Sequence, residues 1–173
     1  MKALRTVAGL ALALLLQSLL ARMAGSFRLP ADLVLVAVVT AALLYGRVAG
    51  LLGGTLAGLA QDGLVGGVIG IGGLASSLAG FVSGAIATQF IVTQAIPRFL
   101  LFVGATFVHG AVFMGLYQVL GLRLFEQPYL TLTTQALINA GVGLVAFGVI
   151  ETLPGLPERM RIRRERRRKV RFH

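Results

Sequence analysis

Residues 99–122, FLLFVGATFVHGAVFMGLYQVLGL, form a run of 24 residues without a charged side chain. A second run of 24, QPYLTLTTQALINAGVGLVAFGVI, covers residues 127–150. Because about 20 helical residues cross a hydrocarbon core of roughly 30 Å, each run is long enough to span a bilayer. The composition agrees, since the 173 residues are 57% hydrophobic and 13% charged, about half the charge of an average soluble domain. The sequence therefore predicts an all-α integral membrane protein.

Shorter uncharged runs, 6–21, 33–46 and 48–61, precede a run of 35 residues at 63–97. That run is too long for one helix, and the six glycines within 63–73 predict a loop. We predict a bundle of six transmembrane helices over roughly 3–22, 31–47, 48–61, 74–94, 98–121 and 131–152. Asp32, Arg47 and Asp62 would then sit at the membrane interfaces. The alternative has five spans, with 31–61 as a re-entrant pair or one short run in the interface.

The distribution of charge predicts the orientation of the bundle. Six spans place Lys2, Arg5, Arg47, Arg98 and the basic C-terminal segment on one side, whereas the charges on the other side cancel. The positive-inside rule therefore predicts cytoplasmic termini. The first helix has the basic start of a signal peptide, with a weak cleavage site at 24–26, but we expect it to be kept as an anchor.

We divide the chain into a transmembrane bundle (1–153) and a basic cytoplasmic tail (154–173). Pro154 and Pro157 end the last helix, and the segment 158–173 holds nine Lys or Arg and two Glu. We interpret the tail as a topology anchor that binds anionic lipids, with docking of an acidic cytoplasmic partner as the alternative. Without interleaved aromatic residues, nucleic-acid binding is not expected. The basic residues are Arg159, Arg161, Arg163, Arg164, Arg166, Arg167, Arg168, Lys169 and Arg171.

Small residues recur at every fourth position on two of the predicted helices. In lipid, small residues at such positions let the backbones of two helices approach closely. We expect packing within the bundle, with a partner's transmembrane helix or a homodimer through one stripe as the alternative. The stripes are Gly50, Gly54 and Gly58, and Ser76, Gly80, Gly84 and Thr88, while Gly141 and Gly148 lie seven apart on the last helix.

Polar residues at membrane depth are few. We predict that Glu151 forms a structural ion pair with Arg47 or Arg98. His109 has no other ligand-type residue at metal-binding spacing, which indicates a hydrogen-bonded interior residue. Interhelical hydrogen bonds are expected from Gln17, Gln89, Gln94, Gln118 and Asn139. The sequence lacks a Ser–His–Asp set, a paired-carboxylate motif and a phosphate-binding loop, so we predict no enzyme activity, no metal and no cofactor.

Several of these features follow one another in the order of a known family. Pro30–Leu33 leads into an apolar helix, and the glycines from 46 to 58 lie on the next one. That helix closes on Gln61–Asp62, which Gly63–Leu64 follows, and Gln17 stands near the end of the first helix. Over about positions 17–70, the chain resembles the bacterial rod-shape-determining family MreD.

The resemblance implies a non-enzymatic scaffold of the cell-elongation complex in the bacterial inner membrane, active in peptidoglycan synthesis and cell shape. It implies direct binding of MreC, through its transmembrane helix and periplasmic juxtamembrane segment. The MreB filament and a SEDS polymerase with its penicillin-binding transpeptidase would be linked indirectly. The interface is expected at the glycines of the third helix with Asp32, Gln61 and Asp62, so a large residue at Gly54 should weaken assembly.

The MreD family also resembles the S components of energy-coupling-factor vitamin transporters, which are six-helix bundles. The resemblance therefore implies an S-component-like fold and supplies the rival function, vitamin binding. A vitamin site requires several convergent polar or aromatic groups, and this chain has three Tyr and no Trp. A pore is disfavoured because no span carries a polar or charged stripe.

Overall fold

The computed structural model describes residues 2–23, 31–90, 92, 94–122 and 128–152. These residues form six α-helices: α1 (Lys2–Met23), α2 (Leu33–Tyr45), α3 (Arg47–Val65), α4 (Ile71–Gln89), α5 (Ala95–Val119) and α6 (Pro128–Thr152). The helices α3, α4, α5 and α6 are long and apolar enough to cross a membrane, whereas α2 and the apolar part of α1, Thr6–Leu20, are shorter. The predicted all-helical architecture is confirmed over the described residues, and four of the six helices are long and apolar enough to cross a membrane, as expected of a helical membrane protein.

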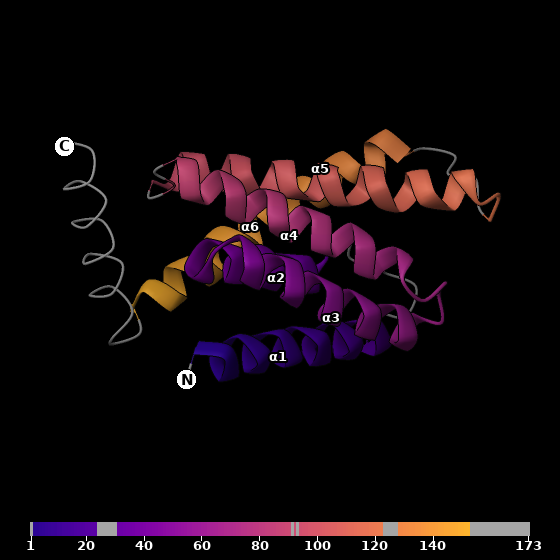
Figure 1. The fold of residues 1–173 in the computed structure, drawn as a ribbon, viewed down its shortest axis with the longest axis horizontal. Helices are drawn as coiled ribbons and strands as arrows, with labels where there is room; N and C mark the ends of the chain where they lie inside the picture. The colour runs from indigo at the N-terminus through magenta and orange to yellow at the C-terminus, as the bar shows by residue number, and fades with distance from the viewer. Residues whose placement is uncertain (1, 24–30, 91, 93, 123–127, 153–173) are drawn as a thin grey trace.

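Successive helices run in opposite directions, so that the start of α1 and the end of α6 lie at the same end of the bundle (Figure 1). We call this the terminal end. The turn between α3 and α4, residues 66–70, lies at the opposite end, which we call the loop end. α2 is the central helix, since it contacts each of the other five. Its burial follows from its sequence, LVLVAVVTAALLY, which is apolar all round.

The chain reverses direction between α2 and α3 at a single residue, Gly46. This glycine has a φ of 97°, in the left-handed region that residues with a Cβ rarely adopt. A Cβ added to Gly84 of α4 would overlap the backbone of Arg47, so the α2–α3 turn rests directly on α4. Gly46 thus makes the turn through its conformation, and Gly84 of α4 leaves room for the turn because it has no side chain.

The two predicted stripes of small residues face each other along the α3–α4 crossing. A Cβ on Gly50 would overlap the carbonyl of Gly80, and one on Gly54 would overlap the carbonyl of Ser76. One turn further along, a Cβ on Gly58 would lie 2.7 Å from the Cα of Gly73. The steps of four residues on both helices place their backbones in contact. The stripes therefore pack within the chain, except for Thr88, which is exposed.

The loop predicted at 63–73 is shorter in the structure, because both flanking helices extend into this range. α3 continues to Val65 and ends in Gly66, whose φ of 73° gives a left-handed C-cap. α4 begins at Ile71 and includes Gly72 and Gly73 in its first turn. Glycine composition suggested irregular structure throughout, but these two glycines are helical because the α3–α4 packing requires small residues there.

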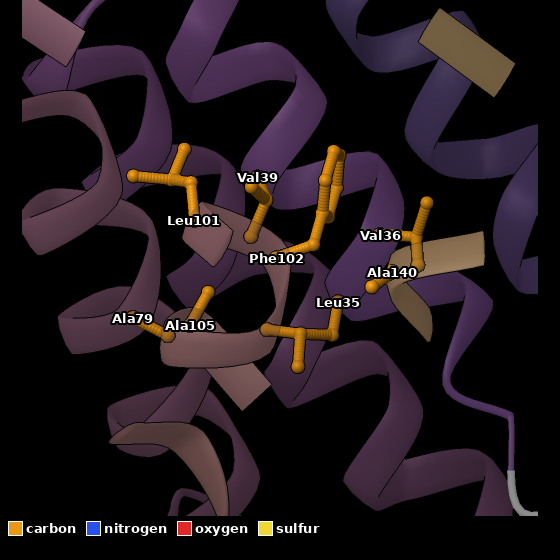
Figure 2. Packing of buried hydrophobic residues seen from close by; sticks show 8 residues of the cluster. All are labelled: Leu35, Val36, Val39, Ala79, Leu101, Phe102, Ala105 and Ala140. Atoms are coloured by element: carbon orange, nitrogen blue, oxygen red, sulfur yellow. The ribbon is translucent and has the colours of Figure 1, made fainter. Parts of the chain in front are cut away.

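The largest hydrophobic cluster fills the space between α2, α5, α6 and α4. Figure 2 shows the ring of Phe102 projecting between Val36 and Val39 of α2, with Ala140 of α6 close by. Gly143 of α6 leaves room for this ring, since a Cβ there would lie 2.7 Å from it. Gly141 and Gly148, by contrast, have no atoms near the position of a Cβ. They face outward and do not form a packing stripe within the described residues.

Candidate functional site

The carboxylate of Asp62 joins α3 to the start of α4. Its Oδ2 accepts hydrogen bonds from three backbone N–H groups, those of Gly70 at 2.9 Å, Gly72 at 3.0 Å and Gly73 at 3.3 Å. The first N–H groups of a helix have no partner within the helix, and its positive end favours a negative charge. Asp62 is only 7% exposed, so its carboxylate is enclosed at the loop end of the bundle. A side chain on Gly72 would collide with this carboxylate.

Asp32 is also buried, and it fixes the start of α2. Its Oδ1 accepts the N–H of Leu35 at 2.9 Å, which makes it the N-cap of the helix. The N–H of Asp32 donates to Oδ1 of Asn139 in α6 at 2.8 Å. Asn139 lies 11 residues into α6, about 16 Å along the helix at 1.5 Å per residue. The short α2 therefore begins deep inside the bundle.

Asn139 connects three helices. Besides accepting from Asp32, its Nδ2 donates to the hydroxyl of Thr106 in α5 at 3.3 Å. The Thr106 hydroxyl in turn donates to the carbonyl of Phe102 at 2.9 Å. Asn139 and Thr106 are each 1% exposed, so the network is sealed from the surroundings of the bundle.

We expect Asn139→Leu to lower the free energy of unfolding by roughly 1 kcal/mol, the scale of interhelical hydrogen bonds in membrane proteins. The change leaves the buried N–H of Asp32 without its acceptor. SDS-driven unfolding in mixed micelles would measure the loss. The control is Thr134→Val, on the exposed face of α6. The double variant with Thr106→Val should cost less than the sum of the two single changes, and strict additivity would contradict the network.

Gln17 holds the start of α2 from the other side. Its Oε1 accepts the N–H of Leu33 at 2.7 Å, and its Nε2 donates to the carbonyl of Ala31 at 3.2 Å. Gln17 and Asn139 thus make the interhelical contacts expected of them. Gln89, Gln94 and Gln118 are exposed at helix ends, so the prediction that they lie inside was wrong.

His109 of α5 is buried, with 9% of its surface exposed, and its ring stacks on Phe113 with 5.9 Å between ring centroids. Phe113 in turn contacts Tyr117, at 4.8 Å. The Tyr117 hydroxyl accepts a hydrogen bond from the N–H of Val68 in the α3–α4 turn at 3.4 Å. The expected hydrogen bond of His109 is absent among the described residues.

We call Asp32, Asp62, Thr106, His109 and Asn139 the polar column. Its members come from α2, α3, α5 and α6, and all are buried. Hydrogen bonds join Asp32, Asn139 and Thr106, His109 follows Thr106 by about one turn of α5, and Asp62 binds the start of α4 at the loop end. Sequence reasoning named Asp32, Asp62, His109 and Asn139 separately but did not bring them together, and it missed Thr106. A hydroxyl at membrane depth was the available signal for Thr106.

The predicted ion pair of Glu151 stays a prediction, because the Glu151 side chain is outside the described residues. Arg98 is buried at the terminal end, with its guanidinium 4.1 Å above the ring of Phe147. Phe147 precedes Glu151 by four residues, one turn of α6. Arg47 is exposed at the start of α3. Gln61 is half-buried beside Asp62.

The basic tail, including all nine Arg and Lys residues named above, lies outside the described residues. Among those that are described, no group of His, Cys, Asp or Glu converges closely enough to hold a metal ion. No protein-family model, curated protein or solved structure matches the chain. The arrangement of the polar column and of the glycine crossing therefore has to be interpreted from the residues themselves.

Proposed function

We propose that this protein is a membrane scaffold of the bacterial cell-elongation machinery, an MreD-like component that binds MreC. In this proposal both termini are cytoplasmic in the inner membrane, and the fold is a six-helix bundle like that of an S component. MreC links the scaffold to MreB and to the SEDS polymerase with its transpeptidase. The basic tail binds anionic lipids.

One observation carries the proposal: the residues on which the resemblance to MreD depends are those that hold the helices together. Gln17 and Asp32 fix the start of α2, and Asp62 joins α3 to α4. The glycines at 50, 54 and 58 form the α3–α4 crossing. Residues that join the helices in this way give the bundle a defined surface, and a scaffold needs such a surface to bind its partner.

The packing of α4 on α3 favours another face of the bundle for the proposed partner. Because α4 covers the glycines of α3, a partner's helix cannot reach them without displacing α4. We therefore place MreC's transmembrane helix on the outer face of α6, where Gly141 and Gly148 are exposed with open space above them. Small residues on an outward face permit the close approach of another helix.

Affinity purification of the tagged chain from native membranes in mild detergent, followed by mass spectrometry, tests this proposal. We expect MreC and the elongation synthase to be recovered. Gly141→Leu should reduce MreC recovery about tenfold, equivalent to ~1.4 kcal/mol. Gly104→Leu is the matched control, since Gly104 of α5 is likewise exposed with open space.

Two outcomes would count against the proposal. Recovery of a transmembrane coupling subunit with paired ATPases, in place of MreC, would identify a vitamin-binding S component instead. Equal recovery of MreC by both glycine variants would remove the binding face from α6.

A further inference from the structure

The loop end of the bundle carries large apolar side chains on its surface. Four of them are exposed in and beside the α3–α4 turn, and two more are exposed where α5 ends (Figure 1). The Tyr117 hydroxyl accepts the N–H of Val68, so the end of α5 lies against this turn. Residues 63–97 and 99–122, which include all six side chains, carry no charge. We call these six residues the apolar patch: Leu64, Val65, Val68, Ile69, Val119 and Leu120.

An apolar patch at the end of a membrane bundle requires a cover, because the ends of such bundles usually face water. Contiguous exposed apolar residues mark a surface that contacts a membrane or a partner. Asp62, the charged residue that precedes the turn, does not make this end polar, since it is buried and its carboxylate accepts three backbone N–H groups. Two further observations favour lipid as the cover.

The first observation is the length of the helices that lead to the patch. α3 begins at Arg47, an exposed cation at the terminal end, and a basic side chain near a helix end reaches the headgroups. α3 and α4 each have 19 residues, about 28 Å at 1.5 Å per residue. The hydrocarbon core is about 30 Å thick. The α3–α4 turn therefore reaches the far boundary of this core without passing beyond it.

The second observation is the bonding of the backbone in the turn. A turn in water can leave its N–H groups to the solvent, whereas in hydrocarbon an unbonded N–H is costly. Asp62 accepts five N–H groups of this segment, three on its carboxylate and two on its carbonyl oxygen. Tyr117 and the carbonyl of Val68 accept one more each. The seven donors are Gly66, Gly67, Val68, Gly70, Ile71, Gly72 and Gly73.

We propose that the apolar patch is embedded among the acyl chains of the leaflet opposite Arg47, so that the α3–α4 turn and the end of α5 do not enter water. The exposed side chains contact lipid. Asp62 and Tyr117 accept the N–H groups for which acyl chains offer no acceptor. The proposal rests on the membrane location of the helices and does not rest on the binding of MreC.

Quenching of a fluorescent label measures the depth of the patch. The chain has no Cys, so Ile69→Cys and Val119→Cys each create a single labelling site, at side chains that are 71% and 85% exposed. Each purified variant is labelled with bimane and reconstituted in phosphatidylcholine vesicles. The quenchers are lipids brominated on their acyl chains and, in separate samples, iodide on both sides of the membrane. The use of two sites keeps the test decisive if one variant does not fold.

Gln89→Cys is the matched control, because Gln89 is exposed at the terminal end of α4. It lies beyond Gly84, which packs against the backbone of Arg47, so its label should reach the headgroups or water. Relative to this control, we expect brominated lipid to quench the labels at Ile69 and Val119 roughly twice as strongly, and iodide about half as strongly, since both labels lie within the hydrocarbon core.

Two results would overturn the proposal. Iodide quenching at Ile69 and Val119 as strong as at Gln89 would place the patch in water, where a partner protein would have to cover it. Protection of both labels from both quenchers would indicate that a second copy of the chain covers the patch. Recovery of MreC from native membranes does not depend on either result, so the failure of this proposal is distinguishable from failure of the scaffold function.

Discussion

Replacing Gly54 with leucine is expected to separate α3 from α4 and to lower the free energy of unfolding by about 3 kcal/mol or more. The first added atom would overlap the backbone carbonyl of Ser76 and approach the Cα of Ser77. Backbone atoms of a helix cannot rotate away as the end of a flexible side chain can. The helices must therefore move apart, which removes the packing along the whole crossing. SDS-driven unfolding or thermal aggregation in mild detergent would measure the effect.

Gly63→Leu is the matched control, because Gly63 lies on the same helix and has no atoms near the position of a Cβ. It should unfold within about 0.5 kcal/mol of the wild type, as surface substitutions generally do. A tolerated Gly54→Leu change would mean that α3 and α4 do not cross at this register. Under the scaffold function proposed above, the destabilised variant should also recover less MreC from native membranes.

Asp62→Ala should lower the free energy of unfolding by about 3 kcal/mol, because three N–H groups at the start of α4 lose their acceptor together. The three donors, from Gly70, Gly72 and Gly73, converge on one oxygen of the carboxylate. Amide hydrogen exchange should therefore accelerate at these glycines and along the first turn of α4. The backbone amides of α5 and α6 should remain as protected from hydrogen exchange as in the wild type.

Asp62→Asn provides the comparison that separates hydrogen bonding from charge. Its amide oxygen can occupy the position of the carboxylate oxygen, so we expect a loss of only ~1 kcal/mol, from the weaker neutral acceptor. If Asn and Ala cost the same, the charge of Asp62 at the positive end of α4 is what stabilises the turn. If neither change has an effect, the cap does not hold the helix.

The six helices could be predicted from the sequence because uncharged runs have lengths that a bilayer dictates. The pairing of the helices could not, since in lipid the outward faces are as apolar as the inward ones. Leu15 of α1 is 68% exposed while Val38 of α2 is fully buried, and hydropathy does not distinguish them. Small residues were the better signal, and they identified both helices of the α3–α4 crossing without showing that they face each other.

Four of the five residues of the polar column were identified from the sequence, all but Thr106, but their depth in the bundle was not. Asp32 stands at the boundary of an apolar run, where an interfacial position is the usual expectation. The structure places it beside the middle of α6 because Asn139, 107 residues later, binds its N–H. One sequence does not reveal a contact of that separation. His109 was expected to form a hydrogen bond like other interior histidines, but among the described residues it stacks on Phe113 instead.

The one-residue turn at Gly46 bears on how the chain enters a membrane. Two helices joined by a single residue cannot be inserted one after the other, because the first would have no slack to wait for the second. We expect α2 and α3 to leave the insertion machinery together as a hairpin, with Gly46 and Arg47 at its tip. α4 then arrives as the third helix and closes over glycines already in place, so synthesis from the N-terminus builds the tightest contact of the bundle early.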